Sequence, residues 1–170
     1  RKHMNTLRTL ALPASIISMT LFGLIAGFFY AFSVDVMRGL DIISPDGAIE
    51  AMQGINIAVR NPVFFITFFV TPIAGLITSV IHFQTGDRRA SLFMIAATLI
   101  YFFGAFLPTA IVNVPMNEAL AVLEPSNDAI ATKEIWEAYS GKWTFWNTAR
   151  TLASSLSLIL SGLSIAAIKK

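Results

Sequence analysis

The stretch Thr151–Ile168, "TLASSLSLILSGLSIAAI", contains no charged residue. It directly follows Trp143–Arg150, "WTFWNTAR", which combines two tryptophans, an asparagine and an arginine. A helix of about 20 apolar residues crosses the ~30 Å hydrocarbon core of a bilayer. The sequence therefore predicts a membrane-spanning helix over residues 148–168 that begins beside a polar and aromatic cluster.

Three more apolar runs predict spans at 12–34, 61–81 and 91–112, and Arg150 is the only charged residue inside any of the four. The chain has 170 residues, of which 55% are hydrophobic and 13% are charged. That charged fraction is about half of the usual value for a soluble domain. We therefore expect an all-α fold: an integral membrane four-helix bundle over residues 1–170, forming a single domain, with short helices in the two outer connections.

The outer connections carry helix signals of their own. "SPDG" at Ser44–Gly47 is typical of a turn, and a short helix is predicted from there to the Asn61-Pro62 pair, where the second span begins. In the second connection, Pro115 is expected to start a helical extension and Pro125 to end it. Residues 131–139 predict one or two further turns, which Gly141 should separate from the fourth span.

Charges predict the orientation of the bundle. One side carries seven cations and a single acid, Asp87, and the other side carries five cations and nine acids. Because positive residues are retained on the cytoplasmic side, both termini should be cytoplasmic. The seven cations are Arg1, Lys2, Arg8, Arg88, Arg89, Lys169 and Lys170.

Polar residues at steps of three and four define one face of each span, because such steps stack on a helix. The fourth span has an apolar opposite face of Leu152, Leu156, Ile159 and Leu163, so its polar face should point into the bundle. That polar face consists of Trp143, Asn147, Arg150, Ser154, Ser157, Ser161 and Ser164. The inward faces of the first three spans are predicted as Thr20, Gly23, Gly27, Ala31, Asp35 and Arg38; Asn56, Arg60, Phe64, Thr67, Thr71, Gly75, Thr78 and His82; and Thr98, Phe102, Ala105, Thr109, Asn113 and Asn117.

Strong polar groups end each face at the outer boundary, so a shared polar layer beneath a roof of tryptophans is expected there. Its predicted members are Asp35, Arg60, Asn113, Asn147 and Arg150. Several of these residues also have a purely structural alternative. Arginine near a helix end can extend outward to water, and tryptophan collects at membrane interfaces regardless of function. Asp35 can pair with Arg38, and Asn113 and Asn117 can satisfy backbone groups freed by Pro115.

The residue types limit the chemistry of this layer. The chain has no cysteine and two histidines, and no metal-ligand spacing, nucleotide-binding loop or nucleic-acid motif is present. We therefore expect neither a metal nor another cofactor. Two arginines and several amides suit a planar, lipophilic molecule with an oxyanion. Arg60 and Arg150 would hold that oxyanion, and Asp35, if partly desolvated, would act as the base.

Four motifs resemble the bacterial branch of the anthrone-oxygenase-like family of small four-helix membrane proteins. They are "AGFFYAFSVDVMRGL" (26–40), "AMQGINIAVRNPVF" (51–64), "NVPMNEAL" (113–120) and "WEAYSGKWTFWNTARTLAS" (136–154). The resemblance implies a bacterial cytoplasmic (inner) membrane protein. It also implies oxidation of an anthrone by molecular oxygen without a metal or a flavin. Its implied site residues are Asn61, Asn113, Asn117, Trp143, Asn147 and Arg150.

Two other functions stay open. The protein could carry a lipid or quinone-like molecule without catalysis, or it could be a membrane scaffold whose outer cap contacts a partner. The expected partners are a lipophilic small molecule and membrane lipids, with no nucleic acid, and a homo-oligomer is left open.

Overall fold

A computed structural model describes residues 2–124 and 128–169, with side chains from residue 6 onward, and all secondary structure within these residues is helical. The elements are α1 (Lys2–Ala31), η1 (Phe32–Val36), α2 (Met37–Asp41), α3 (Pro45–Ala58), α4 (Pro62–Thr85), α5 (Arg88–Tyr101), η2 (Phe102–Phe106), η3 (Thr109–Asn113), α6 (Val114–Ala121) and α7 (Ala129–Ala166), where η marks π-helical turns.

Four continuous helical stretches are long and apolar enough to cross a membrane: Thr6–Asp41, Pro62–Thr85, Arg88–Ala121 and Ala129–Ala166. The predicted all-α membrane bundle is therefore confirmed. Three of the four stretches are much longer than the predicted spans because the helices continue into the outer connections.

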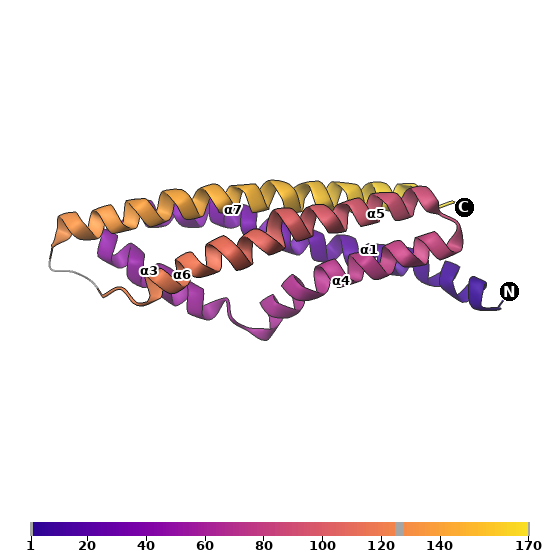
Figure 1. The fold of residues 1–170 in the computed structure, drawn as a ribbon, viewed down its shortest axis with the longest axis horizontal. Coiled ribbons are helices and arrows are strands. Elements are labelled where there is room, and N and C mark those ends of the chain that lie inside the picture. Colours follow the sequence, from indigo (N-terminus) through magenta and orange to yellow (C-terminus); the bar gives the residue numbers. More distant parts are fainter. Residues whose placement is uncertain (1, 125–127, 170) are drawn as a thin grey trace.

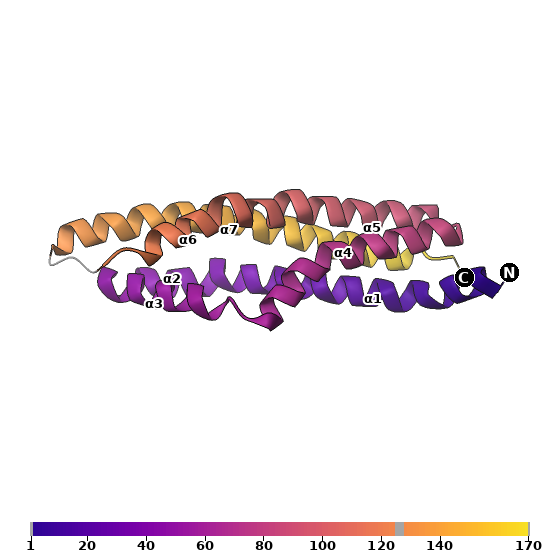
Figure 2. The ribbon, with the colours of Figure 1, turned by 60° about the horizontal axis from the view of Figure 1, so that its bottom comes forward.

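The four long helices form a bundle in which α1 and α5 each pack against both α4 and α7 (Figure 1). Helix α1 begins and α7 ends at the same end of the bundle, beside the α4–α5 turn. Gly86 makes this turn tight by ending α4 with φ 85°, a left-handed conformation that glycine adopts without strain. At the opposite end, which we call the distal end, α3 and α6 pack against the first half of α7 (Figure 2).

Helix α7 runs without interruption through Gly141, so the predicted break there is wrong. A glycine inside a helix costs only about 1 kcal/mol. Trp136, Tyr139 and Trp143, on either side of Gly141, are buried in one apolar cluster with α3, and this packing favours the continuous helix. The helix begins at Asp128, whose Oδ1 accepts hydrogen bonds from the backbone N–H groups of Ile130 and Ala131.

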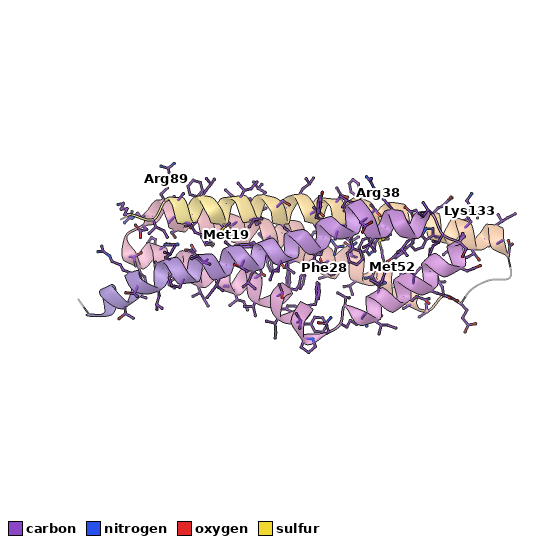
Figure 3. All side chains as sticks on the ribbon, turned by 180° about the vertical axis from the view of Figure 1, so that it is seen from behind. Met19, Phe28, Arg38, Met52, Arg89 and Lys133 are labelled. Carbon is purple, nitrogen blue, oxygen red and sulfur yellow. The ribbon has the colours of Figure 1, made fainter. Side chains whose placement is uncertain are left out.

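Polar contacts fasten the distal end. The Asp41 carboxylate accepts hydrogen bonds from Trp136 Nε1 (3.0 Å) and Ser140 Oγ (2.6 Å), which ties α2 to α7. Gln53 Nε2 donates to the carbonyls of Leu120 and Leu123, both at 2.9 Å, and so satisfies groups at the end of α6. The side chains of Arg89 and Lys133 project from opposite ends of the molecule (Figure 3).

Hydroxyl groups fill much of the membrane-embedded interior. The predicted inward face of the fourth span is buried throughout, and its leucine face is exposed. Ser157 and Ser164 donate to the α5 carbonyls of Ala97 and Ala90, both at 2.8 Å. Between α1 and α4, Ser15 Oγ lies 2.8 Å from His82 Nε2. Such hydroxyls link membrane helices because each can bond across a helix interface.

The predicted inward face of the first span is wrong. Thr20, Gly27 and Asp35 are exposed, and no atom lies within 4 Å of a Cβ built on Gly27. The buried face of α1 instead carries Ser15, Ser18, Phe22, Ile25 and Phe29. Two serines on this face bond to α4, and its large apolar side chains fill the bundle centre.

Candidate functional site

Arg150 is the only charged residue predicted within a span, and its side chain is turned into the bundle. It is 3% exposed. Its Nη1 donates to Thr109 Oγ1 and its Nη2 donates to Asn147 Oδ1, both at 2.9 Å. Its guanidinium carbon lies 4.4 Å from the ring centre of Phe29 and 5.2 Å from that of Trp143. Both distances are typical of cation–π interactions, and these interactions are strongest where water is excluded.

No carboxylate of the residues that the structure describes forms an ion pair with Arg150. The ion pairs of the described residues are Arg60–Glu118 and Lys133–Glu137, and Arg150 Nε has no hydrogen-bond partner among them. Burying a charge without an opposite charge costs free energy, so a buried guanidinium is expected to bind an anionic group.

Asn147 fixes the direction of this guanidinium. It is fully buried, and its Nδ2 donates to the Phe29 carbonyl and to Ser33 Oγ, both at 2.7 Å. Its Oδ1 is thereby turned toward Arg150. Asn147 lies behind Arg150 rather than in the cavity, so its role is to position the arginine.

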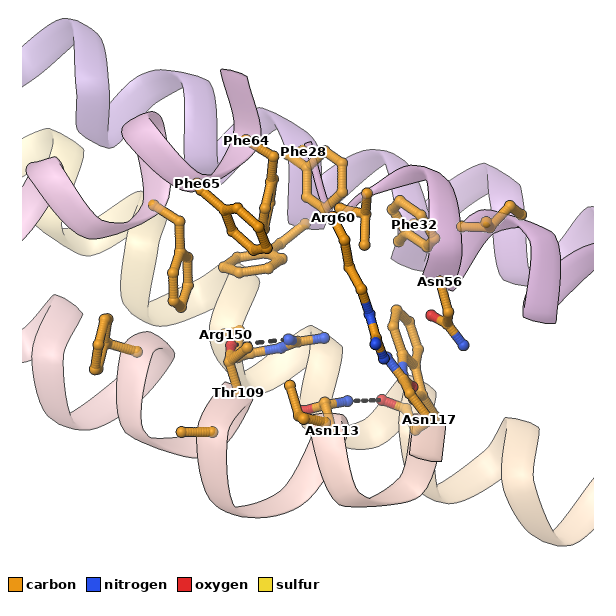
Figure 4. Close-up of a pocket in the computed structure, with 18 of the residues that line it drawn as sticks. Phe28, Phe32, Asn56, Arg60, Phe64, Phe65, Thr109, Asn113, Asn117 and Arg150 are labelled. Atoms are coloured by element: carbon orange, nitrogen blue, oxygen red, sulfur yellow. Dashed lines mark hydrogen bonds between the residues drawn. The ribbon is translucent and has the colours of Figure 1, made fainter. Parts of the chain in front are cut away.

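A cavity of about 400 Å³ lies in front of Arg150 (Figure 4). Its volume is within the range of about 300–1,000 Å³ that is usual for small-molecule sites. The walls come from α1, α3, α4, α7 and the η2–η3–α6 stretch. We call it the Arg150 cavity; its lining residues are Phe28, Phe29, Phe32, Ile55, Asn56, Val59, Arg60, Phe64, Phe65, Phe68, Phe69, Phe106, Thr109, Ala110, Asn113, Val114, Asn117, Glu118, Trp143 and Arg150.

Two π-helical turns shape one wall of the Arg150 cavity. They cover Phe102–Phe106 and Thr109–Asn113, on either side of Pro108. A π turn adds a residue to the helical turn and changes which side chains face inward, and such turns are frequent at functional sites. Here they accompany the inward placement of Phe106, Thr109 and Asn113.

Phenylalanine rings make the cavity predominantly apolar. Phe68 stacks on Phe64 (5.6 Å between ring centres, 14° between planes) and on Phe106 (5.0 Å, 13°), so parallel rings connect α4 to η2. Phe65 and Phe69 also line the cavity and are 42% and 48% exposed. These two residues mark an apolar mouth on the side of the bundle, and at the depth of a membrane such a mouth faces lipid.

The other end of the cavity is polar. Arg60, in the α3–α4 connection, forms an ion pair with Glu118 of α6, and their side chains are 51% and 55% exposed. Asn117 Oδ1 accepts hydrogen bonds from Tyr139 (2.9 Å) and from Trp143 Nε1 (2.8 Å), which holds the Trp143 ring beside Arg150. We call this side the polar mouth.

Two amide groups near the polar mouth are incompletely bonded. Asn113 Nδ2 donates weakly to the Trp143 carbonyl (3.4 Å), but its buried Oδ1 has no partner among the described residues. Nδ2 of the buried Asn56 also has no hydrogen-bond partner among the described residues. Buried polar groups are normally hydrogen-bonded, so both groups are available to a ligand.

The structure brings together most of the residues singled out from the sequence. Arg60, Asn113, Asn117, Trp143 and Arg150 line the cavity. Asn147 lies directly behind it.

Two of the predicted site residues lie elsewhere. Asp35 is exposed on η1 and is not among the lining residues. Asn61 caps α4, because its Oδ1 accepts from the Phe64 N–H at 3.0 Å and its Nδ2 donates to the Ala58 carbonyl. Arg60 is engaged by Glu118, so Arg150 is the unpaired cation of this cavity.

Sequence reasoning missed Glu118 and most of the phenylalanines of the walls; of those that line the cavity, Phe64 was placed on a predicted inward face. Glu118 follows a predicted site residue by one position, but a glutamate in an outer connection is typical of a solvated surface. The pairs Phe64-Phe65 and Phe68-Phe69, four residues apart, were the available signal for an aromatic wall.

Within residues 6–124 and 128–169, no three histidine or carboxylate side chains are close enough to hold a metal ion. The cavity offers a ligand a buried cation, amides, aromatic rings and, at the polar mouth, the Arg60–Glu118 ion pair.

These features define a class: a four-helix membrane protein with an aromatic cavity built around one buried, unpaired arginine. The chain belongs to the anthrone oxygenase family, because the model of that family matches residues 62–160. The matched region begins at α4 and includes the π-helical turns η2 and η3, Glu118, Asn147 and Arg150. No curated protein and no solved structure matches the chain.

Proposed function

We propose that this protein binds a lipophilic phenolic or anthrone-type molecule in the Arg150 cavity and promotes its oxidation by molecular oxygen. The observation that carries the proposal is the buried guanidinium of Arg150, which has aromatic neighbours and, within the described part of the chain, no carboxylate partner. An oxyanion attached to a planar apolar ring system would neutralise this charge, while its rings would contact the phenylalanine walls.

The chemistry requires little besides anion stabilisation. Loss of a proton from the methylene carbon of an anthrone leaves an enolate whose negative charge lies largely on oxygen. Donors placed in advance around a developing oxyanion lower the barrier to its formation, and they are most effective where water is excluded. The electron-rich anion then adds O₂ at the former methylene carbon, and the resulting peroxide anion takes up a proton from water. The hydroperoxide breaks its O–O bond and loses the remaining C–H proton, which releases water and gives the quinone.

We also propose that the protein lies in the bacterial inner membrane with both termini cytoplasmic. This orientation follows from the excess of cations at the end of the bundle that carries the α4–α5 turn. It places the Arg150 cavity in the outer half of the membrane.

The test compares anthrone oxidation by the wild-type protein and two Arg150 variants in lipid nanodiscs, by following quinone absorbance in aerated buffer. We expect Arg150→Met to lower the rate by about 100-fold, the usual cost of losing one oxyanion donor. Arg150→Lys should keep part of it, since it keeps the charge but not both hydrogen bonds. Arg89→Met, at the opposite end, is the control. Equal rates for all four proteins would overturn the proposal.

One observation favours a second function, the non-catalytic carriage of a lipophilic anion: among residues 6–124 and 128–169, no carboxylate pairs with Arg150. A carrier would bind a hydroxyanthraquinone stoichiometrically through Arg150 and give no turnover. If the protein shows no binding and no turnover, the remaining function is that of a membrane scaffold.

A further inference from the structure

We propose that Glu118 is the general base of this site, taking a proton from the bound molecule and releasing it to water at the polar mouth. The inference rests on the proposed function, because it presupposes an acidic organic molecule in the Arg150 cavity. It assigns to α6 the role that the sequence suggested for Asp35.

Glu118 is the one carboxylate among the residues that line the cavity. Asp35 is exposed on η1, outside the lining, and Asp41 is occupied by Trp136 and Ser140. His82 is bonded to Ser15 near the opposite end of α4, far from the cavity. A general base must reach the proton that it removes, so Glu118 is the acidic side chain placed for this step.

The continuous helical stretch Arg88–Ala121 carries both Glu118 and Thr109, which is a hydrogen-bond acceptor of Arg150. Thr109, which accepts from Arg150 Nη1, lies nine residues before Glu118, or about 13 Å along the helix. Both Arg150 and Glu118 have long side chains that line the same cavity. A fused-ring molecule with its oxygen at Arg150 therefore extends toward Glu118.

The charges of the cavity suit a proton transfer to Glu118. Its ion pair with Arg60 requires the ionised carboxylate, which is the form that accepts a proton. Before transfer the charges are Arg60⁺, Arg150⁺ and Glu118⁻. After transfer Glu118 is neutral and the ligand is the anion, so the total is unchanged and the negative charge has moved next to the unpaired arginine.

A base must also lose its proton before the next turnover. The Glu118 side chain is 55% exposed, whereas Arg150 is buried and the lining between them is largely aromatic. Glu118 thus contacts both the cavity and solvent, and water at the polar mouth can accept the proton.

The step balances as follows. A Glu118 carboxylate oxygen forms a bond to the methylene hydrogen, and the C–H electron pair becomes part of the enolate, whose oxygen is held by Arg150. Glu118 then transfers the proton to water. No oxidant takes part in this step, and O₂ is needed only afterwards.

Because the step needs no oxygen, it can be measured without oxidation. Anthrone is incubated under argon in D₂O with protein in nanodiscs, and loss of the methylene proton signal is followed by NMR. We expect Glu118→Gln to slow this exchange by about 100-fold while changing hydroxyanthraquinone binding by no more than about threefold. Glu137→Gln, another exposed glutamate in an ion pair at the distal end, is the matched control and should exchange at the wild-type rate.

A second variant distinguishes a general base from a residue that only positions other groups. Glu118→Ala should regain exchange when formate or acetate is added, as expected when a missing carboxylate is supplied from solution. Exchange by Glu118→Gln at the wild-type rate would overturn the inference. So would a slower exchange that is matched by an equal loss of binding. If the wild-type protein exchanges the proton but forms no quinone, the oxygenase proposal is wrong, and the assignment of Glu118 as the general base is retained. If it binds neither anthrone nor hydroxyanthraquinone, both fail.

Discussion

Arg150 is held by four neighbours of different chemistry. Two hydrogen bonds, to Thr109 and Asn147, fix the plane of the guanidinium, and the rings of Phe29 and Trp143 cover it. A desolvated cation–π contact contributes about 2 kcal/mol, which offsets only part of the cost of burying the charge. The remaining cost makes this residue selective for an anionic group.

Asn147→Ala should therefore weaken both the fold and the site. It removes one bond to α1, one to η1 and one to Arg150, and it leaves buried groups without partners, which costs about 1–3 kcal/mol. We expect a lower melting temperature by circular dichroism and about tenfold weaker binding of a hydroxyanthraquinone. Thr148→Ala is the control, since Thr148 is exposed and its hydroxyl bonds to Ser33 in η1 rather than to Arg150. Unchanged binding by Asn147→Ala would mean that Arg150 keeps its position without this amide.

At the scale of the helices, close packing depends on Gly104 rather than on Gly27, which the sequence placed on the inward face of the first span. A Cβ built on Gly104 would lie 2.5 Å from the Ala153 methyl carbon of α7. Because that methyl is attached to the backbone, an added side chain at position 104 must push the two helices apart. At Gly27, by contrast, the space is open.

Gly104→Ala should accordingly lower the free energy of unfolding by about 1–3 kcal/mol, as overpacked interiors do. Gly27→Ala should leave it unchanged or raise it by up to about 1 kcal/mol, because alanine favours the helix. Thermal unfolding in detergent, monitored by circular dichroism, compares the two variants. Equal melting temperatures would contradict the close contact between Gly104 and Ala153 of α7.

These helices also show what sequence can and cannot predict in a membrane. The inward face of α7 was identifiable because its serines, Asn147 and Arg150 contrast with leucine on the other face. On α1 the contrast is misleading. Phe22 and Phe29 are no less apolar than lipid, so hydrophobicity does not distinguish the core from the lipid surface. The π turns, which turn Phe106 and Asn113 into the cavity, leave no recognisable pattern in the sequence.

The whole molecule is longer than a membrane is thick. Helix α7 has 38 residues and extends for about 57 Å, against a hydrocarbon core of ~30 Å. Arg150 lies 16 residues, or about 24 Å, from the end of α7 at Ala166, so the cavity lies within the core, near its distal edge. The remaining length of α7 supports α3 and α6 beyond the lipid.

Single-cysteine variants test this placement, and the chain has no native cysteine to interfere. In intact bacterial spheroplasts, Lys133→Cys should react with a membrane-impermeant maleimide, whereas Arg88→Cys should react only after lysis. Ile159→Cys, on the exposed apolar face of α7, should stay unreactive in both cases. Labelling of Arg88→Cys before lysis, with Lys133→Cys protected, would show that the bundle is inserted the other way round.

The mouth formed by Phe65 and Phe69 has a practical consequence for purification. An alkyl chain is as suitable a guest for a phenyl-lined opening as a fused-ring compound, so extraction with long-chain surfactants introduces a competitor at high concentration. Apparent affinities should therefore improve as the surfactant tail is shortened or the protein is returned to a bilayer. A tail seated against these rings would also supply no negative charge for the guanidinium behind them.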